Sequence, residues 1–224
     1  MKEECLKIVR EKCENCHACE LGATRKNIVF SDGNPTTAKI VLIGEAPGET
    51  EDETGKPFVG RAGKLLSDFL AQAGISREED VYIINTVKCR PPENRVPTDS
   101  EKAACRKFLE AQIDIIKPRA IILCGATALK SFVELDKKQT ISKVRGQWMS
   151  ISVDGKEYKA MTIFHPSYLL RNHSMEEGSP RRLMQEDLRN IKNEVLSDID
   201  REIPDMPIDV NKYNIFAQQQ MAIL

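Results

Sequence analysis

The sequence of 224 residues lacks several features that would place it in a broad functional class. It has no apolar run near the roughly 18–20 residues that a membrane-spanning helix needs, and its first ten residues, MKEECLKIVR, are charged rather than apolar. Its formal net charge is only −1, which argues against a protein that coats nucleic acid with its whole surface but permits a local basic groove. We therefore expect a soluble, cytoplasmic monomer with no membrane partner.

Two further absences concern disulfide bonds and nucleoside triphosphates. The seven cysteines are an odd number, and the chain is long enough to bury a core without disulfide staples, so metal or cluster ligation explains them better. The segment GEAPGETED (44–52) is strongly acidic and lacks the Lys-Ser/Thr pair of a phosphate-binding loop. Binding of a nucleoside triphosphate is therefore not expected.

Short β-branched runs alternate with helical patterns along the chain. The expected strands are 39–43, 81–87, 120–124, 148–153 and 158–164. The first three have the composition of strands that are buried on both faces. Because single helices separate them, the pattern predicts an α/β fold of three layers, α/β/α, around a mainly parallel central sheet. No internal repeat is present.

The expected helices have recognisable ends. The helix expected at 61–74 has one apolar face and ends at Gly74, a residue that suits a C-cap. The helix at 98–116 begins with Thr98 and Glu101, which match a capping box. A last helix begins near Pro180, and its expected inward residues are Met184, Leu188, Ile191, Val195 and Ile199. We expect one domain over residues 1–203 and an appended tail over 204–224.

Three loops with polar side chains follow strands of the expected sheet. They are 44–52, 85–95 (NTVKCRPPENR) and 165–171 (HPSYLLR). Ligands of such sheets bind at the carboxyl ends of the strands, so these loops predict a binding site. Each feature also has a plain interpretation: the first loop can be a tight turn with solvated acids, His165 a structural histidine, and Phe58 a core residue.

The cysteines form pairs of unequal spacing. Cys16 and Cys19 form a C-x2-C motif, whereas Cys89 and Cys105 are too far apart for a zinc knuckle. An iron–sulfur cluster tolerates varied spacing and is favoured, with zinc as the alternative. Cys13 also forms C-x2-C with Cys16, so it is either a further candidate ligand or a buried hydrophobe on the first helix. The remaining two cysteines, expected in the core, are Cys5 and Cys124.

Six motifs occur in a fixed order, and together they resemble the family 4 uracil-DNA glycosylases. The motifs are CHACELGATR, GEAPGETED, GKPFVGRAG, NTVKCRPPENRVPT, CGATAL and FHPSYLLR. The resemblance covers roughly residues 13–200 and implies the uracil-DNA glycosylase fold with a four-stranded parallel sheet. It also implies a [4Fe–4S] cluster and hydrolysis of the N-glycosidic bond of uracil in single- or double-stranded DNA. This reaction leaves an abasic site and initiates base excision repair.

The same resemblance implies roles for individual residues. The cluster ligands would be Cys16, Cys19, Cys89 and Cys105. The uracil nucleotide must be flipped out of the duplex before its bond is exposed. Neutral His165 would donate to uracil O2, the Asn85 amide would pair with N3–H and O4, and Phe58 would stack on the base.

The sugar side of the pocket would be formed by the first loop. Gly44, Glu45 and the backbone around Ala46 would line it, and Glu45 would position water and favour the cationic sugar. Because Ala46 is not a carboxylate, we expect electrostatic stabilisation rather than strong general-base catalysis.

Candidate DNA contacts lie in the same loops. The candidates for an apolar wedge that fills the vacated space are Tyr168, Leu169 and Leu170. The candidates for phosphate contacts are Lys88, Arg90, Arg95 and Arg171. Cys89 would anchor the cluster, which would hold this loop in place without a redox step.

Two further interpretations remain open. The end of the tail, QQQMAIL, resembles the start of a sliding-clamp-binding peptide but lacks its aromatic residues, so disorder or packing onto a neighbour is the alternative. The chain could also bind uracil-DNA without cutting it, or serve as an iron–sulfur redox module. The joint presence of Glu45, Asn85 and His165 favours the enzyme.

Overall fold

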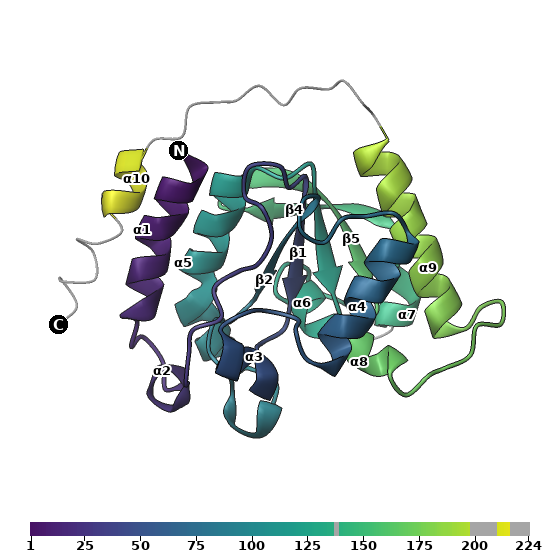
Figure 1. The fold of residues 1–224 in the computed structure, drawn as a ribbon, viewed down its shortest axis with the longest axis horizontal. Helices are drawn as coiled ribbons and strands as arrows, with labels where there is room; N and C mark the ends of the chain where they lie inside the picture. The colour runs from purple at the N-terminus through teal and green to yellow at the C-terminus, as the bar shows by residue number, and fades with distance from the viewer. Residues whose placement is uncertain (137–138, 198–209, 216–224) are drawn as a thin grey trace.

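The computed structural model describes residues 1–136, 139–197 and 210–215, and its centre is one five-stranded sheet (Figure 1). The strands are β1 (Ile40–Gly44), β2 (Val81–Asn85), β3 (Ala120–Cys124), β4 (Trp148–Val153) and β5 (Lys156–Ile163). Their spatial order is β2-β1-β3-β5-β4, and all neighbours are parallel except β4 and β5. The carboxyl ends of the four parallel strands therefore meet at one edge, the lower edge in Figure 1.

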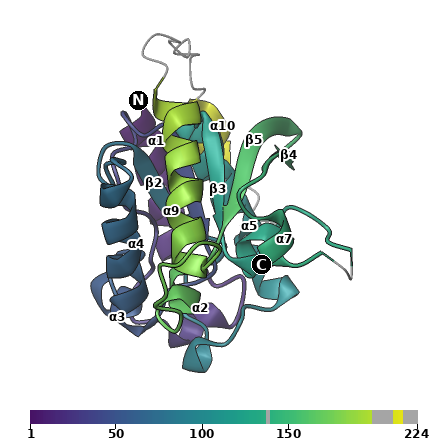
Figure 2. The ribbon, with the colours of Figure 1, turned by 90° about the vertical axis from the view of Figure 1, so that its right-hand side faces the viewer.

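Helices cover both faces of the sheet, as the three-layer prediction requires (Figure 2). Alternate residues of a strand point to opposite faces. Val41 and Ile43 pack in one core with α1 (Lys2–Glu14) and α5 (Asp99–Ile116). Ile40 and Leu42 pack in a second core with α4 (Arg61–Gln72) and α9 (Pro180–Ile191). The predicted α/β/α fold is confirmed.

The prediction of four strands is incomplete, because the described sheet has a fifth strand at its edge. The four parallel strands are present, and β4 adds to β5 as an antiparallel hairpin. The turn between Val153 and Lys156 consists of Asp154 and Gly155, whose φ angles are +49° and +73°. Asp-Gly is a preferred sequence for such a two-residue turn, because both positions need a left-handed backbone.

Two of the expected helix ends are confirmed in detail. The Thr98 side chain accepts a hydrogen bond from the Glu101 N–H at 3.2 Å, and the Glu101 carboxylate accepts one from the Thr98 N–H at 2.8 Å, which completes the capping box of α5. Gly74 follows α4 with a φ of +69°. The predicted inward residues Met184, Leu188, Ile191 and Val195 are buried, and Ile199 lies outside the described residues.

The other short elements surround the lower edge of the sheet or follow the long helices. They are α2 (Leu21–Thr24), α3 (Glu49–Thr54), η1 (Pro92–Asn94), α6 (Ala126–Lys130), α7 (Ile141–Val144), α8 (Pro166–Leu169) and the π-helix η2 (Lys192–Leu196). In Figure 1, α2, α3 and α8 lie at the edge where the parallel strands end.

Part of the expected tail is a helix that packs on the domain. In α10 (Val210–Ile215), Tyr213 is only 2% exposed, and its hydroxyl donates to the Asp114 carboxylate at 2.7 Å. This part of the predicted tail therefore packs on the domain, with Tyr213 in the core cluster that α1 and α5 form. The clamp-like end of the chain, 216–224, lies outside the described residues. None of the described helices is both long and apolar enough to cross a membrane.

Candidate active site

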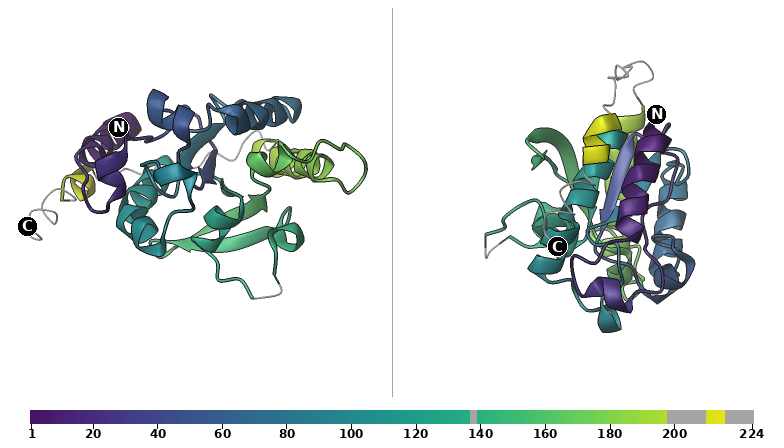
Figure 3. Two further views of the ribbon diagram at one scale, coloured as in Figure 1. Left: turned by 90° about the horizontal axis from the view of Figure 1, so that it is seen from below. Right: turned by 90° about the vertical axis from the view of Figure 1, so that its left-hand side faces the viewer.

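A cavity of about 390 Å³ opens where β1, β2 and β5 end, at the edge seen from below in Figure 3. Five of the residues predicted to bind substrate or catalyse line it, and they are Glu45, Ala46, Phe58, Asn85 and His165. The other lining residues include Glu51, Gly63, Asn94, Arg95 and Ser167. Segments far apart in the sequence therefore meet in one concave site, as the positions of the three loops predicted.

Asn85 presents a free acceptor to this cavity. It is the last residue of β2, it is 1% exposed, and its Oδ1 has no hydrogen-bond partner within the described part of the chain. A buried amide oxygen without a partner costs about 1–3 kcal/mol, so it is expected where a ligand supplies the partner.

Gly44 does not line the cavity, but it makes room for the residues that do. It pairs with Asn85 in the parallel register of β1 and β2. A Cβ atom at Gly44 would lie 2.4 Å from Asn85 Oδ1 and 2.5 Å from the Phe58 ring, closer than real contacts allow. The glycine therefore fixes the distance between the amide and the aromatic ring rather than contacting a ligand itself.

Phe58 forms a wall of the cavity from a strained backbone. Its φ is +52°, a left-handed value that is unfavourable for a bulky side chain. The Glu51 carboxylate holds the following residues, since it accepts hydrogen bonds from the Val59 and Gly60 N–H groups at 2.9 and 2.8 Å. A Cβ at Gly63 would lie 2.0 Å from the Phe58 carbonyl, so α4 can approach this strained turn only with glycine there.

Two acidic side chains of the first loop (44–52) have structural roles and are not simply solvated. Besides the two bonds described above, Glu51 accepts one from the Gly48 N–H at 3.2 Å. Buried Asp52 accepts from the Lys26 and Asn27 N–H groups at 3.0 and 3.3 Å. These two carboxylates hold the first loop against neighbouring segments, a role that the sequence pattern does not indicate.

His165 is a neutral imidazole with a defined tautomer. Its Nδ1 accepts a hydrogen bond from the Ser167 main-chain N–H at 3.2 Å and lies 2.7 Å from the Ser167 hydroxyl. Because a main-chain N–H can only donate, Nδ1 is the acceptor and the ring proton is on Nε2. Burial lowers the pKa of His165 to about 4, so the ring is uncharged at neutral pH. The arrangement provides one N–H donor for a ligand.

Glu45 is held by two threonines. Its carboxylate accepts a hydrogen bond from the Thr127 hydroxyl on α6, and its main-chain carbonyl accepts one from the Thr86 hydroxyl at 2.5 Å. The motif CGATAL contains Thr127 but gave no indication of this contact, because only the fold places α6 beside the first loop. A fixed carboxylate, a neutral N–H donor, an amide acceptor and an aromatic ring suit a planar polar heterocycle joined to a sugar.

A second cavity is lined by sulfur atoms. The cysteines around it are Cys13, Cys16, Cys19, Cys89 and Cys105. Arg25 also lines it and donates to Cys89 Sγ and to the Cys16 carbonyl, both at 3.2 Å. No three His, Cys, Asp or Glu side chains among the described residues are arranged around one metal ion. Thiols that converge from separate segments can bind an iron–sulfur cluster, whose iron atoms each take one thiolate ligand, or a metal ion such as zinc. The other two cysteines, Cys5 and Cys124, are buried in the core, as expected.

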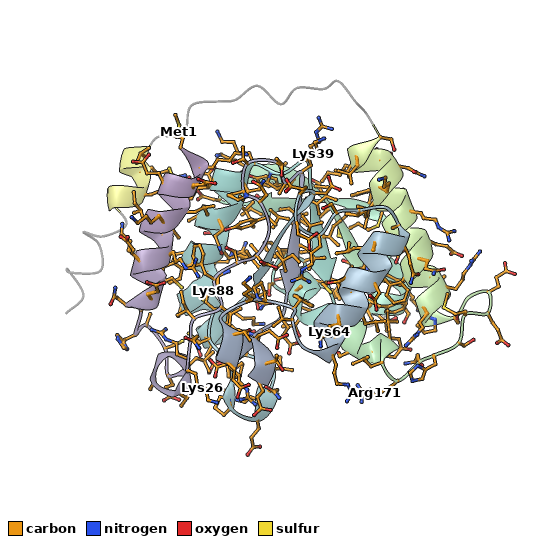
Figure 4. The ribbon with its side chains drawn as sticks, viewed as in Figure 1. Met1, Lys26, Lys39, Lys64, Lys88 and Arg171 are labelled. Carbon is orange, nitrogen blue, oxygen red and sulfur yellow. The ribbon has the colours of Figure 1, made fainter. Side chains whose placement is uncertain are left out.

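The prediction that Lys88 contacts DNA phosphates is wrong. Lys88 is fully buried, and its Nζ donates to the Asn85 carbonyl at 2.9 Å. Figure 4 shows Lys88 within the molecule and Arg171 at its lower edge. Arg90 and Arg95 are hydrogen-bonded within the protein. Arg90 donates to Asn94 Oδ1 of its own loop at 2.8 Å, and Arg95 makes two hydrogen bonds to the Glu101 carboxylate on α5 at 2.6 and 2.8 Å.

The three candidates for the wedge differ in exposure. Leu169, the last residue of α8, is fully buried in the core, so it cannot enter DNA from this conformation and its prediction as a wedge is wrong. Tyr168 is 42% exposed, and its ring lies 5.3 Å from that of Phe164. Leu170 is half-buried.

Comparison with known proteins shows the family of this chain. A family model described as the uracil DNA glycosylase superfamily matches residues 30–189. A type-4 uracil-DNA glycosylase of Thermotoga maritima is 52% identical over 86% of this chain and 95% of its own length. One of Archaeoglobus fulgidus is 43% identical over 76% of this chain and 85% of its own. A type-5 enzyme of Thermus thermophilus is 33% identical, over 45% of this chain and 52% of its own. On this evidence the chain belongs to the uracil-DNA glycosylase superfamily and, within it, to the type-4 uracil-DNA glycosylases.

Proposed function

We propose that this protein removes uracil from single- or double-stranded DNA by hydrolysing its N-glycosidic bond, and that the abasic site it leaves initiates base excision repair. The names of the type-4 relatives support the substrate. The observation that carries the proposal is the buried Asn85 Oδ1 without a partner, in a cavity that also presents a neutral imidazole.

Recognition of the base rests on Asn85 and Phe58. Uracil in a duplex must be flipped into the cavity, at an unpairing cost of a few kcal/mol. There Asn85 Oδ1 accepts a hydrogen bond from uracil N3–H, while its amide nitrogen donates to O4. Cytosine presents an acceptor and a donor at these positions, the reverse of uracil, and a mismatch of this kind costs about 1–3 kcal/mol. Phe58 stacks on the base, which adds about 1–3 kcal/mol.

Cleavage of the bond separates charge, and the site has a group for each charge. As the bond between N1 and the sugar breaks, the electron pair remains on uracil, and His165 Nε2–H donates to O2, where negative charge gathers. Such a preorganised donor contributes about 3–4 kcal/mol. The Glu45 carboxylate, held by Thr127, stabilises the cationic sugar and orients the water that adds to it. Ala46 supplies no second carboxylate, so stabilisation of charge is the main catalytic effect.

We assign a [4Fe–4S] cluster to the sulfur-lined cavity, with Cys16, Cys19, Cys89 and Cys105 as its ligands. All four line one cavity, and membership of the type-4 family supports the assignment. Cys13 lines the same cavity from α1 and is left over as a buried neighbour. When bound, the cluster supplies a cross-link between the N-terminal segment and the loop that begins at Asn85, and the reaction needs no redox step from it.

DNA would lie across the lower edge of the molecule. Tyr168 and Leu170 are the remaining candidates for the wedge, and Arg171 is the exposed candidate for a phosphate contact. Arg90 and Arg95 remain phosphate candidates beside the cavity, in a loop that their own hydrogen bonds stiffen. We further propose that the protein acts as a monomer in the cytoplasm.

A sliding clamp is a further candidate partner through residues 216–224. A pull-down with the full chain and with a chain that ends at Ile215 tests it, because this truncation keeps α10. Equal capture by both chains would exclude the clamp contact.

The decisive experiment measures free base from oligonucleotides that carry one uracil, one cytosine or one thymine at the same position. The expected result is release of uracil alone, from single strands and from duplexes. Tight binding of the uracil strand without release would instead favour a uracil-DNA-binding protein. Absence of both, together with a reversible visible spectrum on reduction, would favour a redox module.

A further inference from the structure

Lys88 carries a charged group at a position that is closed to solvent. Its side chain is fully buried between the end of β2 and the sulfur-lined cavity, which it helps to line (Figure 4). Burying an ammonium group costs several kcal/mol unless opposite charge and hydrogen bonds compensate it. A neutral side chain of the same length would avoid this cost, so the charge at this position needs an explanation.

The contacts of Lys88 run to both proposed sites. Its Nζ donates to the main-chain carbonyl of Asn85 at 2.9 Å. Lys88 also lines the sulfur-lined cavity, together with Cys13, Cys89 and Cys105. One residue therefore touches the strand end that carries the base-reading amide and also faces the thiols.

The hydrogen bond to Asn85 does not compensate the charge by itself. An ammonium group has three donors, and a carbonyl carries only a partial negative charge. The thiols supply what is missing, because four thiolates carry more negative charge than the iron and sulfide of a [4Fe–4S] core offset. Arg25, which donates to Cys89 Sγ at 3.2 Å, approaches the same cavity but does not reach Asn85 in its hydrogen bonds.

We propose that Lys88 is a positioning residue that couples the two sites: its buried ammonium is the counter-charge of the cluster, and its hydrogen bond to the Asn85 carbonyl sets the position of the amide that reads uracil. This inference rests on the proposed function. It extends that function, because it makes base recognition depend on a charge that the cluster holds in place.

The test compares Lys88→Met, Lys88→Gln and Lys88→Arg with the wild type and with Lys7→Met, which removes a charge from an exposed position on α1. Each cluster-loaded protein is measured for the reduction potential of the cluster, for the rate at which a chelator bleaches it, and for KM and kcat on uracil-containing DNA.

Loss of a nearby positive charge disfavours the more negative, reduced cluster. Lys88→Met and Lys88→Gln should therefore shift the potential to more negative values and bleach faster, whereas Lys7→Met should not. Lys88→Met should raise KM about tenfold with a smaller change in kcat, because it removes a binding contribution near the amide. Lys88→Gln, which still has an N–H donor, should lose less affinity than Lys88→Met. Lys88→Arg should keep the potential near that of the wild type.

Three results would overturn the inference. The first is a cluster-loaded Lys88→Met whose potential equals that of Lys7→Met, and the second is an unchanged KM in that variant. The third covers misfolding: if Lys88→Met, Lys88→Gln and Lys88→Arg all fail to fold, shape rather than charge is what the site needs. Folding of Lys88→Arg alone would support the counter-charge. If the wild type releases no uracil, the proposed function fails, while the potential and the bleaching rate still test the counter-charge.

Discussion

The two cavities lie at the two ends of the segment 85–89. Their polar groups differ in whether they find hydrogen-bond partners within the protein. At the active-site end, the buried Asn85 Oδ1 is left without a partner, and the neutral His165 keeps one donor free. At the sulfur-lined end, the charges of Lys88 and Arg25 meet carbonyls and thiols within the protein. In the active-site cavity, the unsatisfied amide oxygen is available to a ligand that comes and goes, whereas the hydrogen-bonded charges at the sulfur-lined end belong to a part that stays assembled. Four changes test this difference.

Substitution of His165 by Ala should abolish most activity and leave the sulfur-lined end intact. Loss of one preorganised donor lowers kcat by about 10²–10³-fold. The visible absorbance of the cluster and the melting temperature should stay near the wild-type values. His173→Ala, at an exposed position, is the matched control and should retain full activity. A rate for His165→Ala within a factor of two of the wild type would remove this histidine from the mechanism.

Substitution of Cys89 by Ala should instead prevent assembly of the cluster and lower the stability of the fold. We expect loss of the visible absorbance and a melting temperature lower by roughly 10 °C, because binding energy of the cluster is folding energy. Cys124→Ala deletes an equally buried thiol in the core and should keep the absorbance, as should Cys13→Ala. Bleaching of Cys13→Ala would show that the ligand set is assigned incorrectly.

Acid should destabilise the folded protein through His165. The unfolded chain takes up a proton at this residue near pH 6.5, whereas the folded chain does so only near pH 4, because burial lowers the pKa of His165 to about 4. The free energy of unfolding therefore decreases as pH falls through this window, by up to about 2 kcal/mol between pH 7 and pH 5. Urea unfolding at both pH values measures it, and His165→Asn should show a smaller decrease. Equal pH dependence in both proteins would refute the neutral, buried imidazole.

Substitution of Thr127 by Val should have the smallest effect. It keeps the shape of the side chain but removes the hydroxyl that donates to the Glu45 carboxylate. A hydrogen bond to a charged group contributes about 1.5–3 kcal/mol, part of which is recovered by water, so we expect kcat to fall about tenfold with little change in KM. Thr127→Ser should restore most of the rate. If Thr127→Ser is as slow as Thr127→Val, the hydroxyl is not what positions Glu45.

Periodicity predicted the layers and strands well, because it reports burial directly. The alternation of Ile40, Val41, Leu42 and Ile43 between two helical layers follows from strand geometry alone. The fifth strand was visible as an apolar run at 148–153. Its absence from the expected sheet came from the family resemblance and not from the pattern.

Site residues could be predicted from the sequence only where the residue type itself indicates a chemical role. Asn85, His165 and Phe58 follow strands or a distinctive motif, so the sequence could bring them together. Lys88 and Leu169 could not be placed, because a lysine two residues before an arginine and a leucine pair in a loop both appear exposed in a sequence. Thr127 and Glu51 act through the three-dimensional contact of loops, for which the sequence carries no local signal.

Binding of the free bases is the most direct test of whether the Asn85 amide reads uracil. Titration calorimetry would measure uracil and cytosine binding to the wild type and to Asn85→Ala. We expect the wild type to bind uracil about 10- to 100-fold more tightly than cytosine, and Asn85→Ala to lose this preference. Equal affinity of the wild type for both bases, or a preference that survives in Asn85→Ala, would contradict it.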